Sequence, residues 1–156
     1  MILVTVGTQK QSFNRLFELV KKSKELKKEE EIIVQKGYTE CNNSKRIHTF
    51  DFISLDDMEK YISDADLIIS HGGVGTIFSA IKKGKKVIAV PRLQKYGEHI
   101  NDHQIEICEA LEQEGYILYY KDGIDTLDDL IKKINKTEFK KYDSDNNYID
   151  KLRKEI

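Results

Sequence analysis

The sequence predicts a single α/β domain of the Rossmann-like type, in which a parallel sheet lies between two layers of helices. Six apolar segments of strand length recur along the 156 residues, and most are separated by segments with helical periodicity, as is typical of a parallel sheet. The strand segments are almost continuously apolar, which indicates that helices cover both faces. A glycine-rich turn follows the fourth strand segment, at the edge where such sheets bind ligands.

The expected elements follow one another in a regular order. The first strand precedes a helix whose apolar residues recur every three or four positions, and the charged run 21–31 is the solvated end of that helix. Two further strands, a short helix and the fourth strand lead to the glycine turn. We expect strands at residues 2–6, 31–35, 46–50, 66–70, 86–90 and 116–120, and helices at residues 13–20, 55–62, 74–83, 99–114 and 126–134.

Composition excludes several classes of protein. Twenty-six basic and twenty-seven acidic residues give a formal net charge of −1, which argues against a general nucleic-acid binder. Cys41 and Cys108 cannot form a disulfide framework, and the opening MILVTVGTQ lacks the features of a signal peptide, so we expect a cytoplasmic chain. No segment approaches the length of a membrane span, and any membrane association must come through a partner or a surface patch.

The segment 65–84 has the layout of a phosphate-binding turn. A buried strand is followed by Gly72, Gly73 and Gly75, and then by a helix with an apolar side. The free amide groups and the positive end of the helix dipole would point beyond the strand, where an anion such as a diphosphate fits. Such a turn also occurs in α/β folds for geometric reasons alone, so neighbouring residues must decide.

The segment 91–104, PRLQKYGEHINDHQ, is unusually polar and leaves the strand beside the glycine turn. Loops of this kind usually face water, but these groups are placed to converge on the same ligand as the turn. The apolar residues that follow anchor the next helix to the core, and rigid anchoring favours a site.

Other chemistries fit less well. His99 and His103 have a spacing that suits one metal ion, but no third ligand has a compelling position and His71 serves equally well as a structural cap, so we expect no metal. The chain lacks the G-x-S-x-G motif that carries the nucleophile of a serine hydrolase. The turn also lacks the P-loop lysine and the dinucleotide glycine spacing, which leaves a nucleotide diphosphate bound without metal-dependent hydrolysis.

Three motifs in order carry a resemblance to a known family. VTVGTQ near the start, FDFI followed by DDMEKYISDADLIISHGGVGT, and VPR with EHINDHQ resemble the nucleotide-sugar-binding, C-terminal half of GT-B glycosyltransferases in family 28. The resemblance runs from residue 1 to about residue 134. Within the family the chain looks most like short bacterial exopolysaccharide and capsule proteins of the PssE type, relatives of the soluble subunit of the eukaryotic dolichol-linked UDP-GlcNAc transferase.

The resemblance implies roles for individual residues. Ser79 stands where related enzymes often carry an acidic residue that holds the ribose, and Glu98 in the neighbouring loop is a candidate to replace it. The resemblance implies no cofactor, since the UDP-sugar is the substrate, and it places the general base in the partner. The implied ligands are Gly7, Thr8, His71, Gly72, Gly73, Gly75 and Thr76 for the diphosphate, Phe52 and Ile53 with Ser79 and Glu98 for the uridine, and Asn101, Asp102, His103 and Gln104 for the donor sugar.

The function that the resemblance implies is that of a hexosyltransferase subunit. The chain would bind the UDP-sugar, and a membrane-anchored partner would supply the acceptor half, so the pair would extend a lipid-linked saccharide for a surface polysaccharide at the inner face of the membrane. The alternative is a non-catalytic accessory protein that stabilises or stimulates a membrane-associated partner transferase. A self-sufficient UDP-sugar epimerase would need a longer chain than 156 residues.

The C-terminal segment 136–156 lies beyond the predicted domain, 1–135. A polar stretch, 136–147, precedes a possible helix with an apolar stripe, which either packs back on the sheet or docks on a partner. Because the stripe follows the polar stretch and lies outside the matched segment, we predict partner docking. The stripe consists of Tyr148, Ile149, Leu152 and Ile156.

Overall fold

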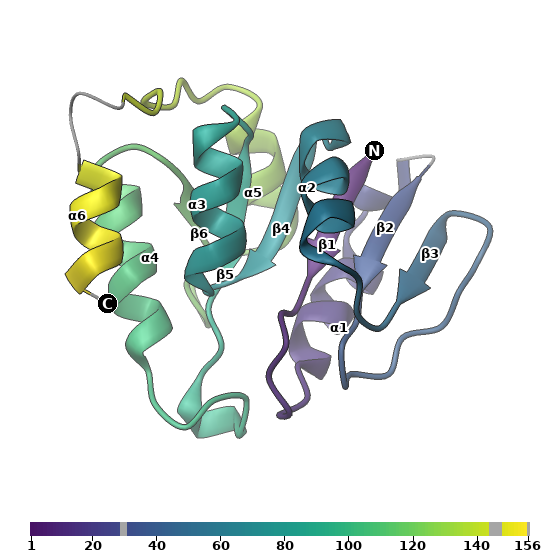
Figure 1. Ribbon diagram of the computed structural model, residues 1–156. Helices are drawn as coiled ribbons and strands as arrows, with labels where there is room; N and C mark the ends of the chain where they lie inside the picture. Colours follow the sequence, from purple (N-terminus) through teal and green to yellow (C-terminus); the bar gives the residue numbers. More distant parts are fainter. Residues whose placement is uncertain (29–30, 144–147, 156) are drawn as a thin grey trace.

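The computed structural model describes residues 1–28, 31–143 and 148–155, and it confirms the α/β fold. Six parallel strands form one sheet in the order β3-β2-β1-β4-β5-β6 (Figure 1). The chain builds outward from β1 to β3 and then returns to the other side of β1, so the strand order reverses between β1 and β4. The strands are β1 Ile2–Thr5, β2 Ile32–Gln35, β3 Ile47–Phe50, β4 Leu67–His71, β5 Val87–Val90 and β6 Leu118–Tyr119.

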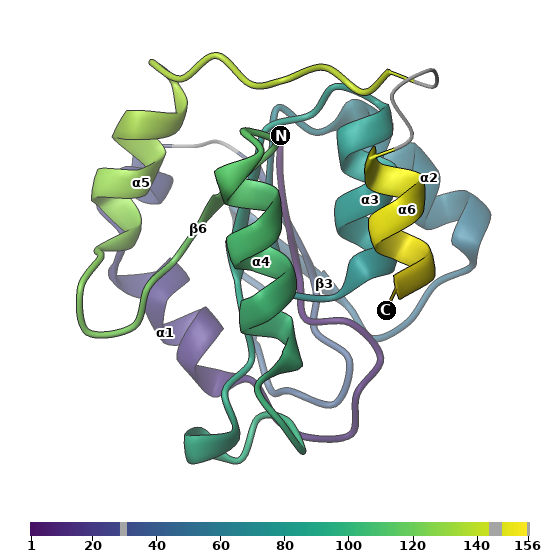
Figure 2. The same cartoon turned by 90° about the vertical axis from the view of Figure 1, so that its left-hand side faces the viewer.

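Helices cover both faces of the sheet, as the continuous apolar strands predicted. Helices α1 and α5 lie on one face, and α2, α3, α4 and α6 contribute to the core on the other (Figure 2). Neighbouring residues of one strand face opposite cores: in β4, Ile68 belongs to one and Ile69 to the other. The helices are α1 Asn14–Lys22, α2 Leu55–Asp64, α3 Val74–Lys82, α4 His103–Gln113, α5 Leu127–Ile134 and α6 Tyr148–Glu155, with 3₁₀ turns at Leu26–Lys28 and Gln94–Tyr96.

The charged run after α1 does not continue the helix. The helix ends at Lys22, and Leu26 is buried in the 3₁₀ turn that follows. Asp128 of α5 accepts hydrogen bonds from the hydroxyl of Ser23 and the amide of Glu25, which fixes this turn against α5. The charge pattern alone predicted a solvated helix end. It could not show the contact with Asp128, which is about a hundred residues away in the sequence. Residues 29–30 of the run lie outside the described residues.

The C-terminal helix packs on its own domain, contrary to the predicted docking on a partner. Ile149 is only 1% exposed and belongs to the core beneath α3 and α4. The ring of Tyr148 stacks on Tyr116 with centroids 6.0 Å apart, and Asp150 pairs with Lys82 of α3. The apolar stripe therefore packs on the domain: Ile149 is buried, and Tyr148 and Leu152 are partly buried against the same core. Its last predicted member, Ile156, lies outside the described residues.

No helix within residues 1–28, 31–143 and 148–155 combines the length and the apolar character needed to cross a membrane.

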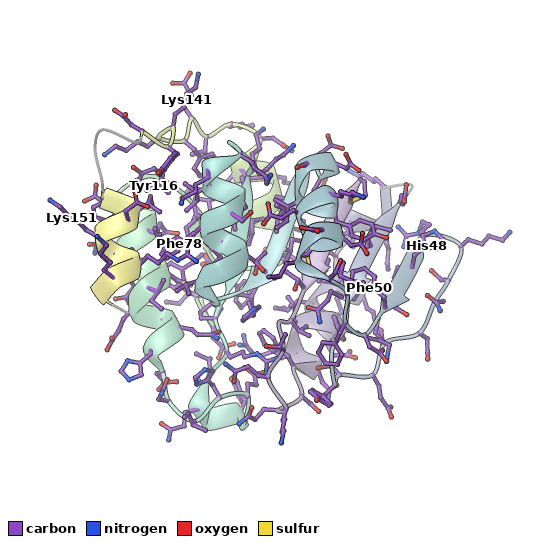
Figure 3. All side chains as sticks on the ribbon, in the orientation of Figure 1. His48, Phe50, Phe78, Tyr116, Lys141 and Lys151 are labelled. Carbon is purple, nitrogen blue, oxygen red and sulfur yellow. The ribbon has the colours of Figure 1, made fainter. Side chains whose placement is uncertain are left out.

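Replacing Ile149 with alanine should lower the free energy of unfolding by about 2 kcal/mol, because the substitution leaves a cavity beneath α6. Chemical denaturation of the two proteins measures this difference. Lys151→Ala is the matched control, since Lys151 is exposed on the outer side of the same helix (Figure 3). An Ile149→Ala protein as stable as the control would mean that α6 does not pack as the structure places it.

Candidate nucleotide-sugar site

The glycine turn joins the carboxyl end of β4 to α3, beside the point where the strand order reverses. Gly73 is the N-cap of α3, and no side chain caps the amides of its first turn. A Cβ atom added at Gly75 would meet nothing within 4 Å, so the backbone there is open. Uncapped amides and the positive end of the helix dipole form an anion-binding site. The structure therefore places an open helix N-terminus where the sequence predicted a phosphate site.

Two of the predicted ligand glycines make room for a protein side chain instead. The ring of His71 lies between Gly7 and Gly73, and an added Cβ would come within 2.4 Å of its Nε2 atom at Gly7 and within 2.0 Å of its Cε1 atom at Gly73. Gly7 also has a φ of +81°, which disfavours any residue with a Cβ. Both positions are therefore glycine because the histidine is packed against them.

His71 is held neutral by its surroundings. Burial, reinforced by the positive charge of Arg92 and by His99, lowers the pKa of His71 to about 3. A neutral imidazole adds no positive charge to the glycine turn, and the side chain is buried. The geometry thus gives His71 a packing role beneath the turn.

Gln104 fastens the glycine turn to the neighbouring strand. Its Oε1 atom accepts hydrogen bonds from the amides of Gly72, at 3.0 Å, and Arg92, at 2.9 Å, and its Nε2 atom lies 3.4 Å from Nδ1 of His71. An added Cβ at Gly72 would lie 2.6 Å from the Cβ of Gln104, which explains this third glycine. Gln104 was predicted to contact the donor sugar; the structure instead commits its carbonyl oxygen to two backbone amides, so it positions the site.

The other predicted sugar ligands lie at the start of α4, which begins at His103 rather than at residue 99. The carboxylate of Asp102 accepts a hydrogen bond from the amide of Gln94, and the side chain of Asn101 accepts one from the amide of His103. These local bonds favour a loop over a longer helix. The imidazole of His103 is exposed and pairs with Glu106, and Asp102 is exposed as well, so these two of the four are accessible to a ligand.

The first loop is fixed by a polar side chain from β2. Gln35 accepts a hydrogen bond from the amide of Gly7 at 3.0 Å and donates to the carbonyls of Gly7 and Asp51. The amide of Gly7 is therefore already bonded, while Thr8 is exposed at the carboxyl edge of the sheet. Of this predicted pair, only Thr8 faces outward as a ligand would require.

Glu98 does not lie with the predicted uridine ligands. Its carboxylate is 3% exposed, forms two hydrogen bonds with Arg15 and accepts a third from the amide of Leu93. The structure thus gives no support to the predicted role of Glu98 in ribose binding, because its oxygens are turned into the protein. Sequence inspection could not show this pairing, since Arg15 is 83 residues away.

Of the remaining uridine candidates, Ser79 lines a groove between α2 and α3, whereas Phe52 and Ile53 precede α2 and are not among the residues that line it. Phe52 is 46% exposed at the end of β3, with its ring edge-on to Tyr38 at 5.2 Å. The hydroxyl of Ser79 donates to the Oε1 atom of Glu59 at 2.7 Å, and this bond lowers the pKa of Glu59. Sequence analysis missed Glu59, because its contact with Ser79 depends on how the two helices pack. The groove is about 640 Å³ in volume and is lined mainly by Leu55, Met58, Glu59, Ile62, Gly75, Thr76 and Ser79.

The two histidines considered for a metal are engaged elsewhere. The Nε2 atom of His99 lies 2.9 Å from the side-chain Nε2 atom of Gln9, and the imidazole of His103 pairs with the carboxylate of Glu106. Throughout the part of the chain that the structure describes, no three His, Cys, Asp or Glu side chains gather as a metal site.

Comparison with known proteins adds a family. The model of the glycosyltransferase family 28 C-terminal domain matches residues 1–155, which extends beyond the motifs quoted above and includes α6. The chain is 34% identical over 64 residues to the UDP-N-acetylglucosamine transferase subunit ALG13 of Homo sapiens, covering 41% of this chain and 5% of that protein. The ALG13 subunit of Debaryomyces hansenii is 27% identical over 120 residues, covering 72% of this chain and 55% of that protein. The chain thus spans a small part of the human protein and about half of the Debaryomyces one.

Solved structures of longer proteins share the fold. The glycosyltransferase of kitacinnamycin superposes with a TM-score of 0.62 at 13% identity, covering 99% of this chain and 38% of that one. MurG of Acinetobacter baumannii superposes with a TM-score of 0.56 at 19% identity, covering 97% of this chain and 49% of that one. At these identities the likeness concerns the fold, and this chain corresponds to less than half of either protein.

Gly73→Ala should lower the free energy of unfolding by about 1–3 kcal/mol, because the methyl group would overlap the buried ring of His71. Gly75→Ala is the matched control: its methyl group enters open space, and alanine is the better helix former, so its stability should equal or exceed that of the wild type. Thermal and urea unfolding compare the three proteins. Equal losses at both positions would contradict the distinction drawn between the two glycines.

Lowering the pH from about 6.5 toward 5 should destabilise the protein. An unfolded histidine takes up a proton near pH 6.5, whereas His71 in the folded protein has a pKa of about 3 and the pKa of His99 is also lowered by burial. The unfolded state therefore binds more protons in this range, and the stability present above pH 6.5 is lost as the pH falls. Urea midpoints as a function of pH measure the loss. An NMR titration in which His71 protonates near pH 6.5 would contradict it.

Proposed function

The chain belongs to the glycosyltransferase family 28 C-terminal domain family, and from this premise we propose that it is the UDP-sugar-binding subunit of a two-component inverting glycosyltransferase. The observation that carries the proposal is the open N-terminus of α3 at Gly75, at the carboxyl end of β4 and at one end of the groove between α2 and α3. A diphosphate on these amides would leave room for the nucleoside in the groove.

This placement suits the chemistry of sugar transfer. When the bond between the sugar and the diphosphate breaks, negative charge grows on the leaving diphosphate. Fixed amide dipoles at the start of α3 would stabilise that charge more strongly in the transition state than in the bound substrate. The chain's own part is then to bind the donor and to stabilise the leaving group, while the base that deprotonates the acceptor would come from the partner.

A partner that covers the carboxyl edge of the sheet fits the distribution of exposed apolar groups. Among the residues that the structure describes, the large exposed apolar side chains all lie in segments that follow the carboxyl ends of β2, β3, β5 or β6, at the lower edge of the sheet in Figure 1. Exposed apolar groups gathered beside a ligand site are typical of a surface that another protein covers. They are Tyr38, Phe52, Leu55, Tyr96, Ile100 and Ile124.

The fuller proposal concerns the pathway. We propose that the partner is a membrane-anchored, acceptor-binding glycosyltransferase subunit, that it holds this chain at the cytoplasmic face of the membrane, and that the pair extends a lipid-linked saccharide in surface polysaccharide biosynthesis. The similarity to ALG13 subunits supports a two-component arrangement, because those proteins are named as subunits of a transferase.

The purified chain should bind UDP, and Gly75→Ala should weaken that binding about tenfold or more, because the added methyl group would occupy the space that the phosphate needs. Isothermal titration calorimetry measures both affinities, and the unchanged stability expected of this variant excludes unfolding as the cause.

Transfer activity separates the catalytic subunit from an accessory protein. Sugar transfer should be negligible with the isolated chain and should appear when the partner is added. Gly75→Ala should then reduce transfer without preventing assembly of the pair. Full transfer by a pair that contains a variant unable to bind UDP would favour the accessory function, and absence of UDP binding even with the partner would overturn the proposal.

A further inference from the structure

The groove between α2 and α3 begins at the proposed diphosphate site and carries one acidic side chain along its length. Gly75 and Thr76 line the groove at the start of α3, and Ser79, which is bonded to Glu59, lies about one helical turn further along. Three basic residues, Lys82, Lys83 and Arg153, also line the groove. The two helices run side by side over the same face of the sheet (Figure 1). A ligand that extends from the start of α3 along this groove therefore lies beside Glu59, the one acidic side chain among the described residues that line it.

The carboxylate of Glu59 is held in position but remains accessible. Its Oε1 atom accepts a hydrogen bond from Ser79 at 2.7 Å, and its Oε2 atom lies 3.1 Å from the Nζ atom of Lys83. The hydrogen bond from Ser79 contributes most to lowering the pKa of Glu59, so the group is ionised at neutral pH. Each carboxylate oxygen can accept a further hydrogen bond, and the side chain is 47% exposed. Glu59 is thus an oriented acceptor with unused capacity.

The spacing fits the ribose of a nucleoside diphosphate. Ser79 follows Thr76 by three residues and lies on the same side of α3, about one helical turn further along, or roughly 5 Å. In a nucleoside diphosphate the ribose is attached directly to the first phosphate group. Carboxylates that accept hydrogen bonds from ribose hydroxyls are a general means of nucleotide recognition.

We propose that Glu59 accepts hydrogen bonds from the ribose hydroxyls of the bound nucleotide, and that Ser79 orients its carboxylate for this purpose. The inference rests on the proposed function and deepens it. Ser79 occupies the position on α3 at which the sequence resemblance implies an acidic residue. The neighbouring helix supplies the missing carboxylate, and Ser79 is the positioning residue that binds it.

The apolar wall of the groove supports this placement. Leu55 is 86% exposed, and Met58 lines the same side of α2. Leu55 follows closely after Phe52, so apolar surface lies beside the carboxylate of Glu59. A nucleoside needs both, because its base packs on apolar surface and its ribose hydroxyls need a hydrogen-bond acceptor.

The test compares UDP with 2′,3′-dideoxy-UDP, which lacks both ribose hydroxyls. The wild-type chain should bind UDP at least about tenfold more tightly, because hydrogen bonds to a charged acceptor are among the stronger ones. Glu59→Gln should reduce this preference to about threefold or less, because it removes the charge but keeps the shape and an acceptor for Ser79. Ser79→Ala should reduce the preference partly. Isothermal titration calorimetry supplies all the affinities.

The matched control is Asp56→Asn, which removes an exposed carboxylate from the same helix but outside the groove, and it should keep the wild-type preference. Equal wild-type affinities for the two nucleotides would overturn the role of Glu59 while leaving UDP binding intact. The role of Glu59 would also be overturned if Glu59→Gln weakened the binding of UDP and of 2′,3′-dideoxy-UDP by the same factor, since that result indicates a structural role for Glu59. A wild-type chain that binds neither nucleotide would instead overturn the proposed function.

Discussion

The buried guanidinium of Arg92 holds together the loops on which the site depends. It is fully buried and donates hydrogen bonds to the carbonyls of Val6, Gln11 and Glu98. Burial of a charge is costly unless it is paired, and here the carbonyls, the negative charge of Glu98 and the ring of Phe13, 5.0 Å away, offset that cost. Burial lowers the pKa of Arg92 only to about 10, so it remains charged at neutral pH. The first loop and the segment after β5 are thereby fixed to each other.

The rest of the site follows from this fixed charge. The backbone amides of Arg92 and Gly72 donate to the same acceptor, the side-chain oxygen of Gln104. This shared acceptor fixes the position of the glycine turn relative to the end of β5. The same positive charge adds to the effect of burial in keeping His71 neutral, and the neutral ring fills the space between Gly7 and Gly73. The scaffold beneath the turn is therefore rigid, while the start of α3 stays open to solvent. An anion would meet amides that need little rearrangement, which is the condition for electrostatic stabilisation of a leaving group.

The chain corresponds to one part of longer solved structures that share its fold. This chain covers 38% and 49% of the two solved structures that share its fold, and its large exposed apolar side chains follow the carboxyl ends of strands, at the edge where the open end of α3 also lies. A second protein that covers this edge would exclude water from the diphosphate and bring the acceptor to the sugar. In the division of labour proposed above, this chain would hold the leaving group and its partner would hold the nucleophile.

Local sequence pattern determined the fold and the general position of the site. Strands of continuous apolar residues, helices with one apolar side and a glycine turn after the fourth strand were all visible, because each is encoded within a few consecutive residues. The order of the strands in the sheet was not predicted and comes from the structure. The phosphate position at the start of α3 stays a prediction, and the sequence could suggest it because it depends on the backbone of one short segment.

Contacts between distant residues were decided only by the tertiary structure. The four glycines of the proposed site look alike in sequence, yet only Gly75 is open, because His71 and Gln104 fill the space at the others. Glu98 is turned inward by Arg15, and Glu59 is brought to Ser79, by the packing of elements that lie far apart in the chain. The apolar side of α6 is buried for the same reason. Periodicity shows that a helix has an apolar side, but only the folded domain decides what covers it.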